Sequence, residues 1–91
     1  MKEIIYNEEE IKQKVCEIIE EKLSIKPGDY NPEEKLSVDL AADSLDLIEI
    51  SMELEREFSI SITDYQVNEM KGYSVADVCM LVSKMVNSRA L

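Results

Sequence analysis

The stretch DSLDLIEISMELEREF, residues 43–58, decides the fold of this 91-residue chain. It contains no proline or glycine, and its apolar residues recur at intervals of three and four, which is typical of an amphipathic helix. Asp43, followed three residues later by Asp46, is a start that can cap the free amide groups of a first turn. We therefore expect a helix over residues 44–58.

This expected helix has two apolar stripes on opposite sides. Successive residues in a helix turn by about 100°, so one stripe holds Leu45, Ile48 and Met52. The other stripe holds Leu47, Ile50, Leu54 and Phe58. A domain of this size needs only one of them for its core. Because the second stripe is longer, we expect it to face inward and the first to face solvent.

Acidic residues border the outward stripe. Asp46, Glu49 and Glu53 fall about 40–100° from its first residue on the same helical wheel. An exposed apolar strip beside a row of carboxylates is typical of a protein-docking surface that attracts basic partners. The alternatives are a helix buried on both sides and three scattered surface residues. The carboxylates weigh against double burial, because burying unpaired carboxylates is costly.

The rest of the chain predicts three further helices. Asn7 precedes three glutamates, which suits a cap and complements the helix dipole. Thr63 can cap a short helix, and Ser74 with Asp77 resembles a capping box before the last one. The inward residues of the last helix would be Val75, Val78, Val82 and Val86. The expected helices span residues 8–22, 44–58, 64–70 and 75–87.

A long connection, residues 24–42, separates the first two helices and contains two proline turns. A loop of this length in a small domain is usually functional or held by its own side chains. We expect Leu36, Val38 and Leu40 to point into the core.

Composition agrees with one small helical domain. The chain is 45% apolar, which allows one modest core, and it has only two glycines and two prolines. We therefore predict a single all-α domain over residues 1–91. It would be a small four-helix bundle, three main helices plus one short one, with a long loop between the first and second helices.

The charge balance restricts the partners. There are 20 acidic and 10 basic residues, a net charge of −10, which repels nucleic acids and anionic membranes and favours proteins with basic patches. The sequence shows no apolar signal core at its start and no run long enough to span a bilayer. We expect a cytoplasmic monomer with no membrane span.

The two cysteines, Cys16 and Cys79, fall on the apolar faces of expected helices. The chain has no histidine and no CxxC pair, so we expect no metal site. Buried free thiols are favoured over a disulfide, as in a reducing compartment. Without histidine there is also no usual base for a catalytic triad, so an intrinsic hydrolase is not expected.

The motif DSLD, which contains Ser44, fits a simple helix cap when taken alone. The role of Ser44 is therefore inferred from the sequence around it. From about residue 8 to 87 the chain resembles acyl carrier proteins. The resemblance is carried by DLAADSLDLIE at residues 39–49, LEREF at 54–58, Ile62, and the late Ser74-Val75. It implies that Ser44 receives 4'-phosphopantetheine from a phosphopantetheinyl transferase, the holo-acyl carrier protein synthase, with coenzyme A as donor.

The resemblance also implies a function. The chain would be a non-catalytic phosphoprotein that holds acyl intermediates as thioesters and presents them to acyl-transferring and fatty acid synthesis enzymes. These enzymes would use their own basic patches to dock on one surface of this chain. That surface would consist of Asp43, Leu45, Asp46, Ile48, Glu49, Met52 and Glu53. A short acyl chain would fold back between the second and third helices, with candidate contacts at Leu54, Ile62, Val67 and Met70. These four are equally explained as ordinary core residues.

Two departures from the family pattern stand out. The family usually has glycine where this chain has Ala41, and because alanine does not easily adopt positive φ, we expect a slightly different approach to the helix. The turn at residues 71–73 is about two residues longer than is common. Two alternatives stay open: a discrete polyketide, peptide-synthesis or D-alanyl carrier, and an acidic helical adaptor with no prosthetic group. Asp46 and the acidic second helix favour the fatty acid type.

Overall fold

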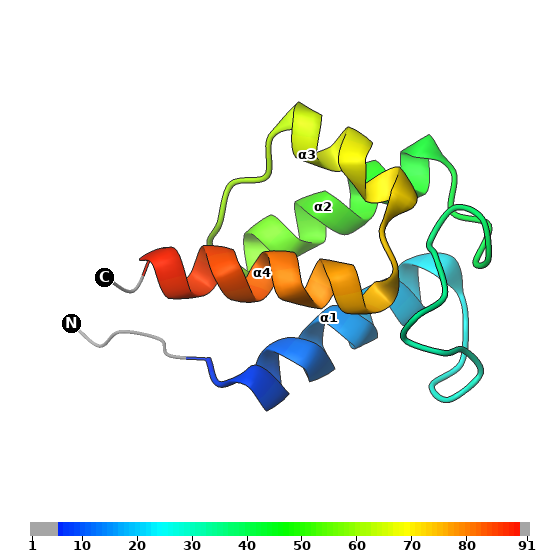
Figure 1. Ribbon diagram of the computed structural model, residues 1–91, viewed down its shortest axis with the longest axis horizontal. Coiled ribbons are helices and arrows are strands. Elements are labelled where there is room, and N and C mark those ends of the chain that lie inside the picture. Colours follow the sequence, from blue (N-terminus) through cyan, green and yellow to red (C-terminus); the bar gives the residue numbers. More distant parts are fainter. Residues whose placement is uncertain (1–5, 90–91) are drawn as a thin grey trace.

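The computed structural model describes residues 6–89 and consists of helices joined by loops (Figure 1). The elements are α1 (Glu8–Leu23), α2 (Ser44–Phe58), α3 (Asp64–Glu69), the 3-10 helix η1 (Met70–Gly72) and α4 (Val75–Arg89). The all-α bundle is confirmed, and each helix boundary lies within two residues of its expected place. The turn expected at residues 71–73 is for the most part the 3-10 helix η1.

The helix starts follow from local sequence. The Asn7 side chain accepts a hydrogen bond from the Glu10 amide at 2.8 Å, and the Glu10 carboxylate accepts one from the Asn7 amide at 3.1 Å. Ser74 and Asp77 cap α4 in the same reciprocal way. Thr63 caps α3. These contacts satisfy amide groups that the first turn of a helix leaves without partners.

One hydrophobic core joins all the helices. The long apolar stripe of α2 and the valine stripe of α4 are buried, as expected. Both α2 and α4 pack against α1, and Figure 1 shows α1 and α4 side by side and running in opposite directions. Each buried aliphatic or aromatic side chain stabilises the fold by about 1.5–3 kcal/mol. The fully buried large residues are Ile11, Val15, Ile19, Leu36, Leu47, Ile50, Leu54, Phe58, Met70, Val75, Val78 and Val82.

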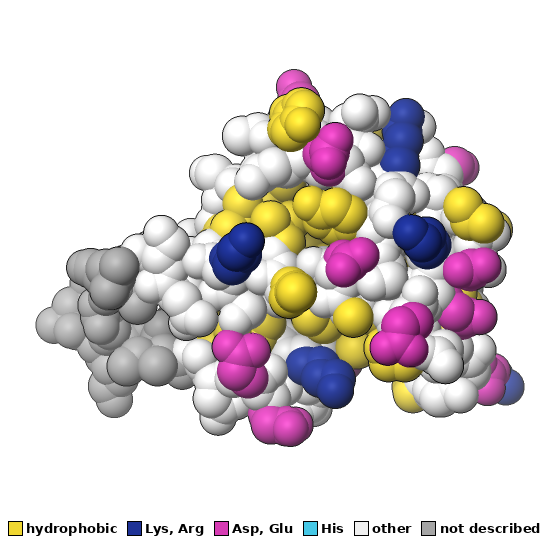
Figure 2. Space-filling model, in the orientation of Figure 1, with side chains coloured by type: hydrophobic (Ala, Val, Ile, Leu, Met, Phe, Trp, Pro, Cys, Tyr) yellow, Lys and Arg dark blue, Asp and Glu magenta, His cyan; other side chains and the backbone are white. Residues whose placement is uncertain are grey.

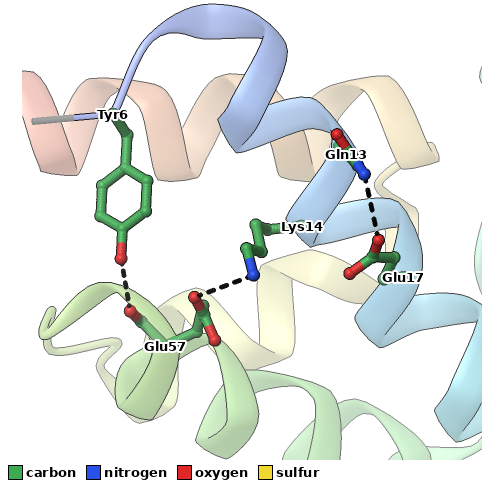
Figure 3. A network of polar contacts seen from close by, with 5 residues as sticks. All are labelled: Tyr6, Gln13, Lys14, Glu17 and Glu57. Carbon is green, nitrogen blue, oxygen red and sulfur yellow. Dashed lines mark hydrogen bonds and ion pairs between the residues drawn. The ribbon is translucent and has the colours of Figure 1, made fainter.

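The segment before α1 is fastened to the end of α2 (Figure 3). The Tyr6 ring meets Phe58 edge-on, with the ring centroids 4.9 Å apart. The Tyr6 hydroxyl donates a hydrogen bond to the Glu57 carbonyl oxygen at 3.0 Å. The Lys14 ammonium lies 3.8 Å from the Glu57 carboxylate. This ion pair is exposed, so the aromatic contact and the hydrogen bond contribute more to the joint.

The long connection between α1 and α2 is held against the turn that precedes α4. Leu36 is fully buried, and its amide donates to the Tyr73 carbonyl oxygen at 3.0 Å. The Ala76 amide donates to the Pro32 carbonyl oxygen at 2.9 Å, and Lys35 forms an isolated bridge with Ser74. The loop therefore has a defined path and ends where α2 begins.

The prediction that Val38 points into the core was wrong, because its side chain is 79% exposed. The amides of Asp39 and Leu40 both donate to the Lys35 carbonyl oxygen, so this part of the loop makes a helical turn. Residues four apart in such a turn share a face. Leu36 and Leu40 therefore both reach the core, while Val38 lies on the opposite side.

Candidate functional site

The approach to α2 contains a residue in the left-handed region. Ala41 has φ 61°, so alanine adopts the positive φ that glycine would adopt freely. The expectation that Ala41 would avoid positive φ was therefore wrong. The next residue is buried, and the Ala42 amide donates to the Leu36 carbonyl oxygen at 2.8 Å. These contacts hold Ala41 in a conformation that costs about 1–2 kcal/mol for a residue with a Cβ.

The two aspartates around Ser44 form a reciprocal cap. The Asp43 carboxylate accepts a hydrogen bond from the Asp46 amide at 2.9 Å, and the Asp46 carboxylate accepts one from the Asp43 amide at 3.1 Å. Ser44 is the first residue of α2, and its side chain is exposed. The aspartates thus have a structural role, while the serine between them presents its hydroxyl to solvent.

The electrostatics at Ser44 combine two opposing effects. The start of a helix has free amide groups and a partial positive charge, which stabilise a nearby anion by about 0.3–1 kcal/mol. The carboxylates of Asp43 and Asp46 oppose this, but the site is solvent-exposed and the repulsion is screened. The sequence has no histidine to activate the hydroxyl.

A groove between α2 and α3 opens beside Ser44. Its volume is about 570 Å³. Among the four acyl-contact candidates, Ile62 and Val67 line it, whereas Leu54 and Met70 are fully buried in the core and are not part of its wall. The lining consists of Ser44, Leu47, Ile48, Ser51, Met52, Glu55, Ile62, Asp64, Val67, Asn68 and Lys71.

The outward stripe of α2 is exposed, as expected. Leu45, Ile48 and Met52 have exposed fractions of 62%, 46% and 53%. Ile48 and Met52 also line the groove, so the stripe and the groove share a wall. The exposed stripe of α2 and the groove between α2 and α3, which the sequence analysis predicted as separate sites, are therefore continuous near Ser44.

The acidic residues beside the stripe differ in their surroundings. Glu49 is exposed, as is Asp43 at the cap. The Glu53 carboxylate lies 3.1 Å from the guanidinium of Arg56, three residues along the helix. Asp46 is engaged in the cap. Glu49 is thus the acidic residue of α2 whose charge is most openly presented.

The groove lining includes five polar residues that were not among the predicted site residues: Ser51, Glu55, Asp64, Asn68 and Lys71. Ser51 lies seven residues after Ser44, which is nearly two helical turns, so their shared face could have been read from the sequence. Its hydroxyl donates to the Ile48 carbonyl oxygen at 2.8 Å. Lys71 comes from η1 across the groove, and its position depends on tertiary packing that no local pattern reveals.

Residues 6–89 contain neither a metal-binding cluster nor a membrane-spanning helix. No three cysteine or acidic side chains there are grouped as a metal ion would require. No helix in that range is both long and apolar enough to cross a membrane.

Comparison with known proteins gives consistent matches. A family model described as the phosphopantetheine attachment site matches residues 13–79. The acyl carrier protein of Chlorobium phaeovibrioides is 51% identical over 57 residues, which cover 63% of this chain and 73% of that protein. The acyl carrier protein of Porphyromonas gingivalis is 37% identical over 75 residues, 82% of this chain and 94% of that protein. That of Thermosynechococcus vestitus is 39% identical over 80 residues, 88% and 96% respectively.

Proposed function

The chain belongs to the acyl carrier protein family, whose prosthetic group is phosphopantetheine, and we propose that Ser44 is the residue that carries this group. We propose that the chain is a carrier and not a catalyst, as other acyl carrier proteins are. In this proposal the Ser44 hydroxyl forms a phosphodiester with 4'-phosphopantetheine. The thiol at the end of that arm then holds the acyl group as a thioester.

The observation that carries the proposal is the position of Ser44. It is the first residue of α2, it is exposed, and it lies on the wall of the groove between α2 and α3. A transferase can reach the hydroxyl, and the helix start stabilises the added negative charge. The arm would leave the protein beside a groove that offers apolar side chains to an acyl chain.

We propose that the groove holds the first carbons of the acyl group. Ile48, Met52, Ile62 and Val67 provide apolar wall, and about 570 Å³ lies within the range of small-molecule sites. Each methylene that enters would gain about 0.8 kcal/mol. Leu54 and Met70 stay candidates for a deeper floor, which a chain would reach only if the core around them opened.

We propose that partner enzymes dock on the outward face of α2. Leu45, Ile48 and Met52 supply exposed apolar contact, and Glu49 supplies an open negative charge next to them. Basic patches on a phosphopantetheinyl transferase or an acyl-transferring enzyme would be attracted to the net charge of −10. The negative charge of this face is increased by Asp43 and Asp46, which form the cap. It is also increased by Glu53, which forms an ion pair with Arg56.

For the pathway we propose fatty acid synthesis in the cytoplasm. The acidic second helix and Asp46 next to the attachment serine favour this type of carrier. The free cysteines are compatible with a reducing compartment. A discrete polyketide, peptide-synthesis or D-alanyl carrier would use the same arm with a different acyl group.

Loading in vitro tests the attachment residue. The chain is incubated with a broad-specificity phosphopantetheinyl transferase and coenzyme A, and its intact mass is measured. We expect one added phosphopantetheine on the natural chain and on Ser61→Ala, a matched exposed serine, but none on Ser44→Ala. If Ser44→Ala is still modified, the assignment is wrong. If the natural chain is never modified, the acidic adaptor becomes the better hypothesis.

The pathway is tested on protein taken from its native cells. Mass spectrometry of the thioester identifies the acyl group. Saturated chains that lengthen by two carbons support fatty acid synthesis, whereas a D-alanyl or other aminoacyl group contradicts it. This result is independent of which residue holds the arm.

A further inference from the structure

Cys16 and Cys79 lie in adjacent turns of the contact between two antiparallel helices. Figure 1 shows α1 and α4 side by side and running in opposite directions. The Ser83 hydroxyl donates to the Glu8 carboxylate at 2.7 Å across this contact. Ser83 is one turn after Cys79, and Glu8 is about two turns before Cys16. Because the helices are antiparallel, this register places Cys79 opposite Lys12, one turn along α1 from Cys16, so the two cysteines lie in adjacent turns of the helix contact.

Both thiols reach the same surface groove. The groove between α1 and α4 has a volume of about 1030 Å³, and its lining includes Cys16, Cys79 and Met80. Both cysteines are half-buried and unbridged, so the expectation of buried thiols holds only in part. Figure 2 shows hydrophobic side chains, a class that there includes cysteine, reaching the surface along the seam between α4 and α1. A small reagent can therefore approach the pair from solvent.

The two thiols lie close enough to shift each other's pKa. The pKa of Cys16 is lowered to about 6, chiefly by hydrogen bonding from the Cys79 thiol. Tyr30 and Lys12 also lower this pKa, whereas burial and Glu20 raise it. The same contact, followed by burial, raises the pKa of Cys79. In the structure the Tyr30 hydroxyl donates its single proton to the Glu20 carboxylate at 2.7 Å, so Cys79 is the main donor to the Cys16 thiolate. Cys16 is thus the nucleophile of the pair, and Cys79 is its proton-bearing neighbour.

From this placement we propose that Cys16 and Cys79 form a modification site for low-molecular-weight disulfides, which convert the pair into a reversible cross-link between α1 and α4. The site is separate from the groove beside Ser44, because the two grooves share no lining residue. The proposal therefore does not depend on the carrier function.

The reaction proceeds in two exchange steps. The Cys16 thiolate attacks one sulfur of glutathione disulfide, forms a mixed disulfide and releases one glutathione thiolate, which takes up a proton. Cys79 then loses its proton to solvent and attacks the Cys16 sulfur. The new Sγ–Sγ bond forms as the second glutathione thiolate leaves and is protonated. Two protein thiols are oxidised, and one glutathione disulfide is reduced to two glutathione molecules.

The test uses the full chain as the Ser44→Ala variant, so that these two cysteines are its only thiols and no prosthetic arm competes. The protein is equilibrated with glutathione disulfide, quenched with acid, alkylated under denaturing conditions and weighed intact. We expect a monomer that is lighter by two hydrogens, carries no alkyl group and returns to two alkylated thiols after dithiothreitol. Two free thiols, stable glutathione adducts or covalent dimers would each overturn the proposal.

Variants that lack one cysteine test whether glutathione disulfide reaches each thiol, separately from whether the two thiols can bond to each other. Cys16→Ala and Cys79→Ala each lack the second thiol, so we expect each to retain one glutathione as a mixed disulfide. If both variants take up glutathione while the parent chain keeps two adducts, the thiols are accessible but misplaced, and the proposal fails.

The pH profile gives a second readout. In the reduced parent chain, alkylation of Cys16 should rise through about pH 6 and level off near pH 7, because its thiolate is held by Cys79, Tyr30 and Lys12 against Glu20. In Cys79→Ala the midpoint should move toward the ordinary thiol value, because the main hydrogen-bond donor is gone. An unchanged midpoint would contradict the proximity of the two thiols within the shared groove, on which the proposal rests.

Discussion

Replacing Ala41 with glycine should stabilise the protein, although glycine usually weakens a fold. Ala41 has φ 61° immediately before the helix that carries Ser44. Relief of the left-handed strain is worth about 1–2 kcal/mol. The greater freedom of glycine in the unfolded chain removes about 0.4–1 kcal/mol. The net gain in the free energy of unfolding is then about 0.5–1 kcal/mol.

The assay is thermal and urea unfolding followed by circular dichroism. For a domain of this size, the net gain corresponds to a rise in Tm of roughly 2–8 °C. The matched control is Ala76→Gly, because Ala76 lies within α4 in ordinary helical conformation. Glycine there should lower stability by about 0.5–1 kcal/mol. Opposite signs at these two alanines are the expected result.

A fall in Tm for Ala41→Gly as large as that for Ala76→Gly would rule out the positive φ of Ala41. Ala41 would then have a negative φ in solution, and the approach to α2 would differ from that in the structure. Loading of Ser44 by the transferase should be unchanged in both variants, because neither substitution alters the serine or its cap.

Three further predictions concern docking, the loop and charge. Ile48→Glu and Glu49→Lys should each slow acyl transfer by partner enzymes. Because both residues are exposed, the free energy of unfolding should change by no more than about 0.5 kcal/mol. Transfer kinetics and urea unfolding measure the two effects, and unfolding of either variant would show that this face is not outward. Leu36→Ala should lower the free energy of unfolding in urea by about 2–5 kcal/mol, whereas Val38→Ala should change it by less than about 0.5 kcal/mol. Equal losses in the two variants would contradict the helical turn in the loop. Added sodium chloride should raise Tm, because screening reduces the self-repulsion of a net charge of −10; a Tm that does not rise would mean that repulsion is a minor effect.

The sequence predicts most of the fold because its local signals agree with one another. Asn7, Thr63 and Ser74 each cap the helix that they were expected to start. The two stripes of α2 divide as expected, because only the longer one is buried in the core. Local periodicity and capping are sufficient where a helix packs on one face.

The differences arise where tertiary contacts override local preference. Ala41 adopts positive φ because the buried Ala42 and its hydrogen bond to Leu36 fix the path of the chain. Val38 is exposed because the loop makes a helical turn that single-residue hydrophobicity does not reveal. Lys71 reaches the groove through the packing of η1, and the pairing of Cys16 with Cys79 depends on the register of α1 against α4. Each of these requires knowing which elements are neighbours.

The central claim is that Ser44 holds the phosphopantetheine arm. The most direct measurement is fragment-ion mass spectrometry of the loaded chain after proteolysis. We predict that the whole added mass lies on Ser44 and that Ser51 and Ser61, which lie along the same face of α2 or just beyond its end, are unmodified. Phosphopantetheine on any residue other than Ser44 would contradict the account.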